Sequence, residues 1–119
     1  MKLLSIVVPC YNSQDYMEHC IASLLPGGSQ VEILIVDDGS KDGTAAIADR
    51  LAAEHPDMIR AIHQENAGHG GAVNTGLAHA SGLFFKVVDS DDWVDADAYR
   101  SILDFLRTAA REDRLPDLL

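Results

Sequence analysis

The most concentrated chemistry in this sequence is the acidic run Asp89-Ser90-Asp91-Asp92, which follows a short apolar stretch. Carboxylates at positions i and i+2 that leave the end of a strand can both face one Mg²⁺ or Mn²⁺, and a bound diphosphate would complete the coordination of the ion. Without a cation, carboxylates crowded in this way would repel one another, so a metal is the natural compensation. The spacing therefore indicates a divalent-cation site at Asp89 and Asp91, with the part played by Asp92 left open.

A second acidic pair, Asp37-Asp38, ends another apolar stretch and leads into a polar turn. Part of this turn is structural, because Asp42 or Thr44 is expected to cap the helix that follows. A carboxylate at the end of a strand can also accept hydrogen bonds from the N–H of a base or from ribose hydroxyls. We therefore predict a ligand-binding role for Asp38 first, with Asp37 as the second candidate.

Residues near these two segments divide into structural and ligand-contact candidates. Asp95 and Asp97 are expected to cap or charge the first turn of a helix, and Trp93 is interpreted as a packing anchor rather than a platform for substrate. The five histidines, at positions 19, 55, 63, 69 and 79, lack the spacing of a zinc site, and most are expected on the surface. We retain His69 and Asn74 as candidates for ligand contacts.

A glycine-rich segment, Gly68-His69-Gly70-Gly71, lies between an expected strand and an expected helix. Its backbone N–H groups could meet phosphate, which makes Gly68 a further candidate. The segment matches neither G-x-G-x-x-G, because position 73 is valine, nor a Walker loop. We therefore predict a flexible loop here.

The elements that must position these residues alternate along the chain. Short apolar runs predict strands at 3–8, 31–36, 58–63 and 83–88. Apolar residues at helical spacing predict a helix after each strand: Met17, Cys20, Ile21 and Leu24; Ile47, Ala48, Leu51 and Ala52; Val73, Leu77 and Ala80; Tyr99, Ile102, Leu103, Leu106 and Ala110. This order indicates an α/β fold, an open and mainly parallel sheet with helices on both faces. Ligands of such sheets bind beyond the carboxyl ends of the strands, where the candidate residues would converge.

Length, charge and cysteine content limit the class of protein. The 119 residues suit one domain, and a formal net charge of −10 disfavours nucleic acid and anionic lipid as partners, since both attract basic side chains. Cys10 and Cys20 predict reduced thiols in a cytoplasmic protein. The first apolar run is expected to be a buried strand rather than a signal peptide, and no apolar stretch approaches the roughly 18 residues that span a bilayer.

Four segments occur in order and at ordinary spacing over nearly the whole chain. They are Ser5-Ile6-Val7-Val8-Pro9-Cys10-Tyr11-Asn12, Val36-Asp37-Asp38-Gly39-Ser40-Lys41-Asp42-Gly43-Thr44, Asn66-Ala67-Gly68 and Asp89-Ser90-Asp91-Asp92. Together they resemble glycosyltransferase family 2. The resemblance implies the Rossmann-like nucleotide-diphospho-sugar transferase fold (GT-A). It also implies transfer of a sugar from a nucleotide donor, usually UDP-linked, to a hydroxyl of a glycan, lipid-linked or other acceptor, with inversion at the anomeric carbon.

The resemblance also assigns roles to individual residues. Pro9, Tyr11 and Asp38 would hold the base and ribose. Asp89 and Asp91 would match the D-x-D motif, with Asp91 a direct ligand of Mg²⁺ or Mn²⁺ and Asp89 nearer the ribose, and the metal would neutralise charge on the departing diphosphate. The full set expected to bind the nucleotide sugar is Pro9, Tyr11, Asn12, Asp38, Gly68, His69, Asn74, Asp89 and Ser90.

Members of this family are considerably longer, and their acceptor-binding part and catalytic base follow the D-x-D motif. We therefore expect residues 1–119 to be the N-terminal nucleotide-sugar-binding part, with the acceptor-binding part absent and the general base beyond Leu119. The segment Leu115-Pro116-Asp117-Leu118-Leu119 looks like the start of a further strand. Such a piece is expected to bind donor and metal without transferring sugar, and to self-associate through exposed apolar surface. The full-length protein would lie at the cytoplasmic face of a membrane if it carries membrane segments.

Three alternatives belong to other classes. A phosphoacceptor receiver domain is also α/β, acidic and Mg²⁺-binding, but it carries its acidic pair after the first strand, where this chain has Pro9-Cys10-Tyr11-Asn12. A sugar-1-phosphate nucleotidyltransferase would carry a glycine-rich loop with basic residues there. The third alternative is a non-catalytic module that binds metal or nucleotide.

Overall fold

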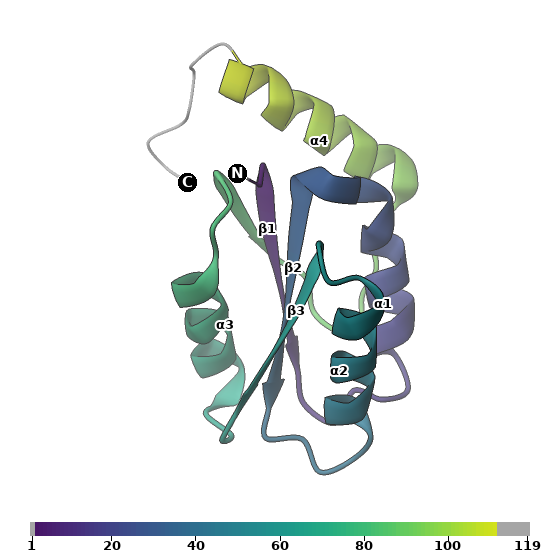
Figure 1. Cartoon of the computed structure of the whole chain (residues 1–119), viewed down its shortest axis with the longest axis vertical. Coiled ribbons are helices and arrows are strands. Elements are labelled where there is room, and N and C mark those ends of the chain that lie inside the picture. Colours follow the sequence, from purple (N-terminus) through teal and green to yellow (C-terminus); the bar gives the residue numbers. More distant parts are fainter. Residues whose placement is uncertain (1, 112–119) are drawn as a thin grey trace.

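The computed structural model describes residues 2–111, and Figure 1 shows a sheet with helices packed against it. The strands are β1 (Leu4–Cys10), β2 (Val31–Asp38), β3 (Ile59–Gln64) and β4 (Phe84–Val87). The helices are α1 (Met17–Leu24), the 3₁₀ helix η1 (Leu25–Gln30), α2 (Thr44–Glu54), α3 (Gly68–His79) and α4 (Ala96–Arg111). Each predicted strand and helix is present in the predicted order. The strand expected at 115–119 lies outside the described residues.

All the strands are parallel, in the order β3-β2-β1-β4. The chain adds β2 and β3 on one side of β1 and then crosses back to add β4 on the other side. Strand order therefore reverses between β1 and β4. The predicted open parallel sheet is confirmed, and the carboxyl ends of β1 and β4 mark the place where sheets of this kind bind ligands.

Helices cover both faces of the sheet because its central strands are apolar on both sides. Ile6 and Val8 of β1 join a core with α1, α2 and α4, whereas Val7 and Leu34 pack under α3. Every residue of β1 and β2 is buried, which is why these strands are mostly apolar rather than alternating; within them the buried Ser5 hydroxyl donates to the Glu32 carboxylate at 2.7 Å. Figure 1 shows α3 on one side of the sheet and α1 and α2 on the other.

The helix starts use the acidic residues that the sequence assigned to them. An Asp95 carboxylate oxygen accepts a hydrogen bond from the Ala98 N–H at 2.9 Å, at the start of α4. Asp97 lies in the first turn of the same helix. An Asp42 oxygen accepts the Thr44 N–H at 2.9 Å, where α2 begins. These structural predictions are confirmed, and they separate the helix-start acids from the acids of the candidate site.

Helix α3 differs from the prediction at its start and on its buried face. It begins at Gly68, so the glycine-rich segment expected to be a flexible loop is its first turn. Its buried residues are Ala72 and Gly76, whereas Leu77, predicted to be core, is 53% exposed. The small residues let α3 approach β1: a Cβ added at Gly76 would lie 2.4 Å from Val7 Cγ1.

Helix α4 buries Tyr99, Leu103 and Leu106 as predicted. Ile102, also predicted to be core, is 42% exposed, and its neighbour Phe105 is 69% exposed. These two side chains leave apolar surface on α4. Within residues 2–111, none of the helices combines the length and the apolar character that crossing a membrane requires.

The approach of α3 to β1 makes a prediction about stability. Gly76→Ala should lower the free energy of unfolding by about 1–3 kcal/mol, because the new methyl group must displace Val7 or the helix. Gly70→Ala is the matched control in the same helix, since its Cβ would have no atom within 4 Å and alanine favours helix by up to about 1 kcal/mol. Urea unfolding of both variants measures the difference. Equal stability of the two variants would contradict the packing described here.

Candidate functional site

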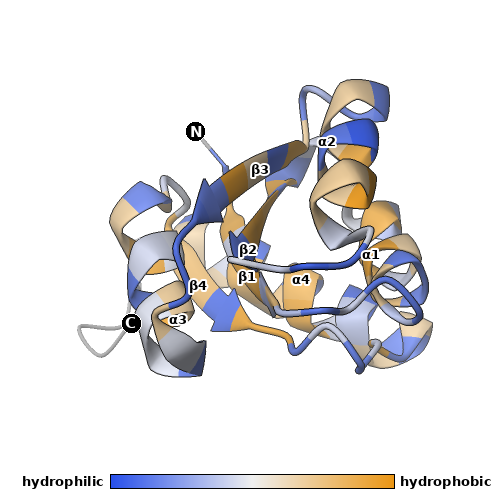
Figure 2. Ribbon diagram, turned by 90° about the horizontal axis from the view of Figure 1, so that it is seen from below, coloured by the Kyte–Doolittle hydropathy of each residue, from blue (hydrophilic) through white to orange (hydrophobic). Residues whose placement is uncertain are grey.

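The carboxyl ends of the parallel strands bring the candidate residues to one edge of the sheet. Cys10 at the end of β1 is in register with Asp37 near the end of β2. The acidic run begins two residues after β4 ends. Figure 2 looks onto this edge, where hydrophilic segments leave the more hydrophobic strands. The predicted convergence of the segments that follow β1, β2 and β4 is therefore present.

The acidic run forms a compact group of carboxylates. Asp89, Asp91 and Asp92 each offer a carboxylate oxygen, and these three oxygens all lie within 4.8 Å of one another. A turn closed by the Asp92 N–H and the Asp89 carbonyl, 3.0 Å apart, brings the side chains together. All three residues are exposed, and oxygen donors of this kind suit Mg²⁺ or Mn²⁺. Asp92, left open by the sequence, therefore joins the other two as a possible ligand.

Helix α3 contacts the acidic run through a histidine. His69 Nε2 lies 2.8 Å from Asp89 Oδ1, and both side chains are exposed. The two residues face a shallow cavity of about 290 Å³ that Pro9, Tyr11 and Ser90 also line. Residues that the sequence selected from three different segments therefore surround one space. Asp91 lines this cavity as well.

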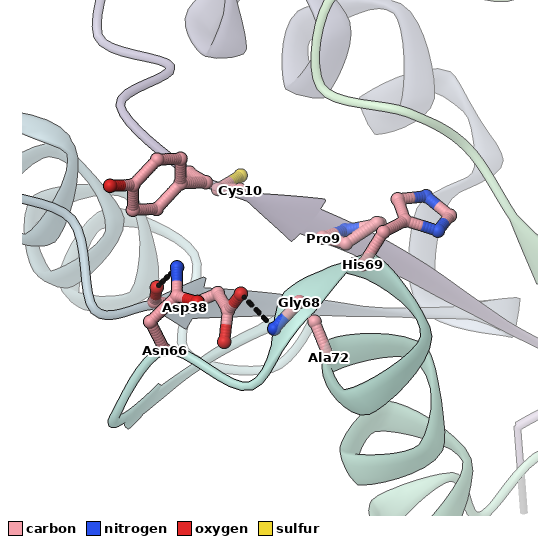
Figure 3. A pocket seen from close by; sticks show the side chains of 8 residues that line it. Pro9, Cys10, Asp38, Asn66, Gly68, His69 and Ala72 are labelled. Carbon is pink, nitrogen blue, oxygen red and sulfur yellow. Dashed lines mark hydrogen bonds between the residues drawn. The ribbon is translucent and has the colours of Figure 1, made fainter.

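A second cavity, of about 250 Å³, lies beside Asp38 (Figure 3). It shares Pro9, Tyr11 and His69 with the first cavity, and its other lining residues are Cys10, Asp38, Asn66, Gly68 and Ala72. The two cavities are therefore contiguous around the ends of β1 and β2. One end of this combined space faces Asp38, and the other faces the acidic run.

The Asp38 carboxylate is 3% exposed and is held by the protein itself. Oδ1 accepts hydrogen bonds from Gln64 Nε2 at 2.9 Å and from the Ala67 N–H at 2.8 Å, and Oδ2 accepts one from the Gly68 N–H at 3.0 Å. Desolvation would raise the pKa of Asp38, but these hydrogen bonds outweigh it and lower the pKa. A carboxylate accepts about four hydrogen bonds. Asp38 therefore stays ionised and anchors the start of α3. Its contacts within residues 2–111 leave one acceptor position on Oδ2.

Two sequence-selected residues lie apart from the cavities. Asn12 has a φ of +49°, and it joins two loops: its N–H donates to Ser40 Oγ at 3.0 Å, and its Oδ1 accepts the Lys41 N–H at 2.8 Å. Asn74 is exposed on α3. Neither residue lines either of the two cavities.

The sequence analysis did not predict the position of His63 between two carboxylates. His63 Nδ1 lies 2.8 Å from Asp37 Oδ2, and His63 Nε2 lies 2.7 Å from Asp49 Oδ1. A neutral imidazole has a single N–H and cannot donate to both partners. The hydrogen bonds to Asp37 and Asp49 therefore favour the imidazolium and raise the pKa of His63. Asp37 was the second candidate for ligand binding. In the structure it is buried, and its carboxylate contacts His63 instead.

Two buried thiols lie close to the same edge. Cys10 lines the Asp38 cavity, and the Cys20 thiol on α1 donates to the Asp89 carbonyl at 3.5 Å. Burial is the main reason that the pKa of each thiol rises to about 12. Both cysteines are free, as expected. They remain protonated near neutral pH and are poor nucleophiles.

The sequence matches a large family of sugar-transferring enzymes. A family model described as glycosyl transferase family 2 matches residues 5–111. The uncharacterized glycosyltransferase EpsJ of Bacillus subtilis is 40% identical over 103 residues, which are 86% of this chain and 30% of the relative. Chondroitin synthase of Escherichia coli is 39% identical over 108 residues, which are 90% of this chain and 16% of the relative. The chain thus spans less than a third of the length of these two relatives.

Solved structures share the fold. TarS of S. aureus (residues 1–349) in complex with UDP-GlcNAc matches with a TM-score of 0.77 and 29% identity, over 92% of this chain and 32% of that one. The mannosyltransferase PcManGT from Pyrobaculum calidifontis, in complex with GDP-Man and Mn²⁺, matches with a TM-score of 0.72 and 28% identity, over 84% of this chain and 31% of that one. The arrangement of strands and helices described above is therefore that of proteins which bind nucleotide sugars.

The His63 contacts predict that stability depends on pH. Because folding raises the pKa of His63, its contribution is complete below the ordinary value of about 6.5 and is lost as the pH rises through the higher folded-state pKa. Urea unfolding should show the wild type losing stability above about pH 6.5 relative to His63→Gln. Asp49→Asn should reduce this loss, because it removes one of the two carboxylates. A difference between wild type and His63→Gln that is constant with pH would refute the assignment.

Proposed function

This chain belongs to glycosyl transferase family 2, and we propose that it forms the donor-binding part of an enzyme that transfers a sugar from a nucleotide diphosphate to a hydroxyl. The observation that carries the proposal is the group of three carboxylates beside two contiguous cavities, at the edge where strand order reverses. The family match sets aside the receiver-domain and nucleotidyltransferase alternatives. The proposed donor is UDP-linked, with TarS and its bound UDP-GlcNAc as support.

The two cavities suit the two chemical parts of such a donor. The nucleoside would lie between Pro9, Tyr11 and Asp38, where the free acceptor position of Asp38 can take a hydrogen bond from a base N–H or a ribose hydroxyl. The diphosphate would then extend past His69 toward the acidic run. Ser90 lines the cavity beside the acidic run. Gly68 lines the Asp38 cavity, but its N–H donates to Asp38 rather than facing phosphate as the sequence predicted.

We propose, from the charges at the site, that a cation strengthens this binding. A diphosphate is anionic, and it would approach three carboxylates on a chain whose net charge is −10. A divalent cation bound by Asp91 with Asp89 or Asp92 would turn this repulsion into attraction, and it would stabilise the charge that develops on the departing diphosphate. The presence of Mn²⁺ in the PcManGT complex supports this choice of metal. The transfer that we propose inverts the anomeric carbon.

The acceptor site and the general base are proposed to lie in the part of the relatives that this chain does not match. The chain covers 30% or less of the two curated relatives named above. We therefore propose that residues 1–119 bind donor and metal, and that transfer to a glycan or lipid-linked hydroxyl needs further residues. Ile102 and Phe105 supply exposed apolar surface for the self-association we expect. A cytoplasmic location remains a prediction.

The metal-dependent donor site can be tested by calorimetry with UDP. The wild type should bind UDP in the presence of Mn²⁺, and Asp91→Asn should weaken this binding by about 100-fold or more, since losing a ligand should cost at least as much as losing an outer partner. Asp97→Asn is the matched control, because this carboxylate is exposed in the first turn of α4. UDP binding that is unaffected by Mn²⁺ or by Asp91→Asn would refute the site.

A separate prediction follows from the proposal that this chain binds the donor but lacks the general base for transfer. The 119-residue chain should bind UDP-GlcNAc with Mn²⁺ but should not glycosylate added oligosaccharide acceptors, because no general base is proposed within it. Mass spectrometry of the acceptors after incubation measures transfer directly. Donor-dependent glycosylation by this chain alone would show that the base lies within these residues.

A further inference from the structure

The side chain that follows the acidic run makes an unusual contact. The indole of Trp93 stacks on the imidazole of His19, with ring centroids 4.7 Å apart and planes 16° from parallel. His19 is on the exposed side of α1, and Trp93 is itself 60% exposed. The sequence analysis expected Trp93 to be a packing anchor, but the side chain lies outside the core and stacks on the surface of α1.

Further contacts join the acidic run to α1 and to the turn before it. At the start of the run, the Cys20 thiol donates to the Asp89 carbonyl at 3.5 Å, and the hydroxyls of Ser13 and Ser90 lie 2.7 Å apart. Beyond the end of the run, the Val94 N–H donates to Ser23 Oγ at 3.1 Å. The run is thus held against α1 at its first residue, Asp89, and at Val94, just beyond its last residue.

These contacts to α1 counteract the electrostatic repulsion between the carboxylates of the acidic run. Carboxylates whose oxygens lie within 4.8 Å of one another repel, and an exposed loop that is free to move would separate them. If the loop were mobile without a cation, binding the cation would have to order it, and this loss of conformational entropy would weaken cation binding. Contacts on both sides of Asp91 and Asp92 reduce that cost by holding the loop closed beforehand.

We propose that His19 and Trp93 are a positioning pair that holds the Asp91 and Asp92 carboxylates ready for a divalent cation. This inference rests on the metal-dependent donor binding proposed above. Neither ring lines the two cavities assigned to the donor, and Trp93 instead lines a neighbouring cavity of about 410 Å³ with Asp89 and Asp92. The pair therefore acts on the acidic run and not on the nucleoside. Their effect should therefore be confined to the part of UDP affinity that Mn²⁺ adds.

The experiment measures UDP affinity with Mn²⁺ and with EDTA, and takes the ratio as the gain due to metal. His19→Ala should reduce this gain about three- to tenfold while leaving the affinity in EDTA unchanged, because the loss of one aromatic stack is of this order. His19→Phe should restore the gain, since its ring can stack without a polar atom. His79→Ala is the matched control, because His79 is an exposed histidine whose hydrogen-bond partner within residues 2–111 is the Thr75 carbonyl of its own helix.

Trp93→Leu and Trp93→Phe test the same contact from the other side, with the gain expected to fall for leucine and to persist for phenylalanine. Circular dichroism of each variant verifies folding. A full metal gain in His19→Ala, or an equal loss with Mn²⁺ and with EDTA, would overturn the positioning role while Asp91→Asn still tests the metal site. A wild type without any metal gain would overturn both proposals together.

Discussion

The hydrogen bonds of the Asp38 carboxylate are the interaction on which the geometry of this edge depends. Asp38 ends β2, and its oxygens accept the N–H groups of Ala67 and Gly68 where α3 begins. N–H groups at a helix start lack partners within the helix, and a buried anion satisfies them while remaining charged. Through this contact α3 is placed so that His69 reaches Asp89, and the segments after β2, β3 and β4 share one site.

Hydrophobic periodicity predicted those helices whose buried face is set by the residues of the helix itself. The apolar stripe Met17, Cys20, Ile21 and Leu24 is fully buried in α1, because bulky side chains at helical spacing there do face the core. The start of α3 could not be predicted in this way, since it depends on Asp38, which lies 30 residues earlier than Gly68. The buried face of α3 was also mispredicted: hydropathy periodicity favours bulk, whereas close packing on Val7 requires Gly76.

In the candidate site, too, some contacts could be predicted from the order of elements and others could not. Parallel strands send their carboxyl ends to one edge, so the order of elements was enough to expect Asp38, Asp89 and Asp91 together. The Asp37–His63 contact depends instead on the register of β2 against β3, where these two residues are directly paired. No single-sequence pattern specifies that register. The stack of His19 on Trp93 likewise needs the position of α1 relative to the loop after β4.

The buried thiols of Cys10 and Cys20 have a practical consequence. Alkylating reagents attack thiolates, and neither cysteine ionises readily while its pKa is raised to about 12. Modification therefore requires the end of β1 or the face of α1 to open toward water. The rate of labelling would then report how often this edge of the sheet opens, and slower labelling in the presence of UDP and Mn²⁺ would measure how strongly the ligands close it. The two cysteines are thus built-in probes of local opening, one at the end of β1 and one on α1.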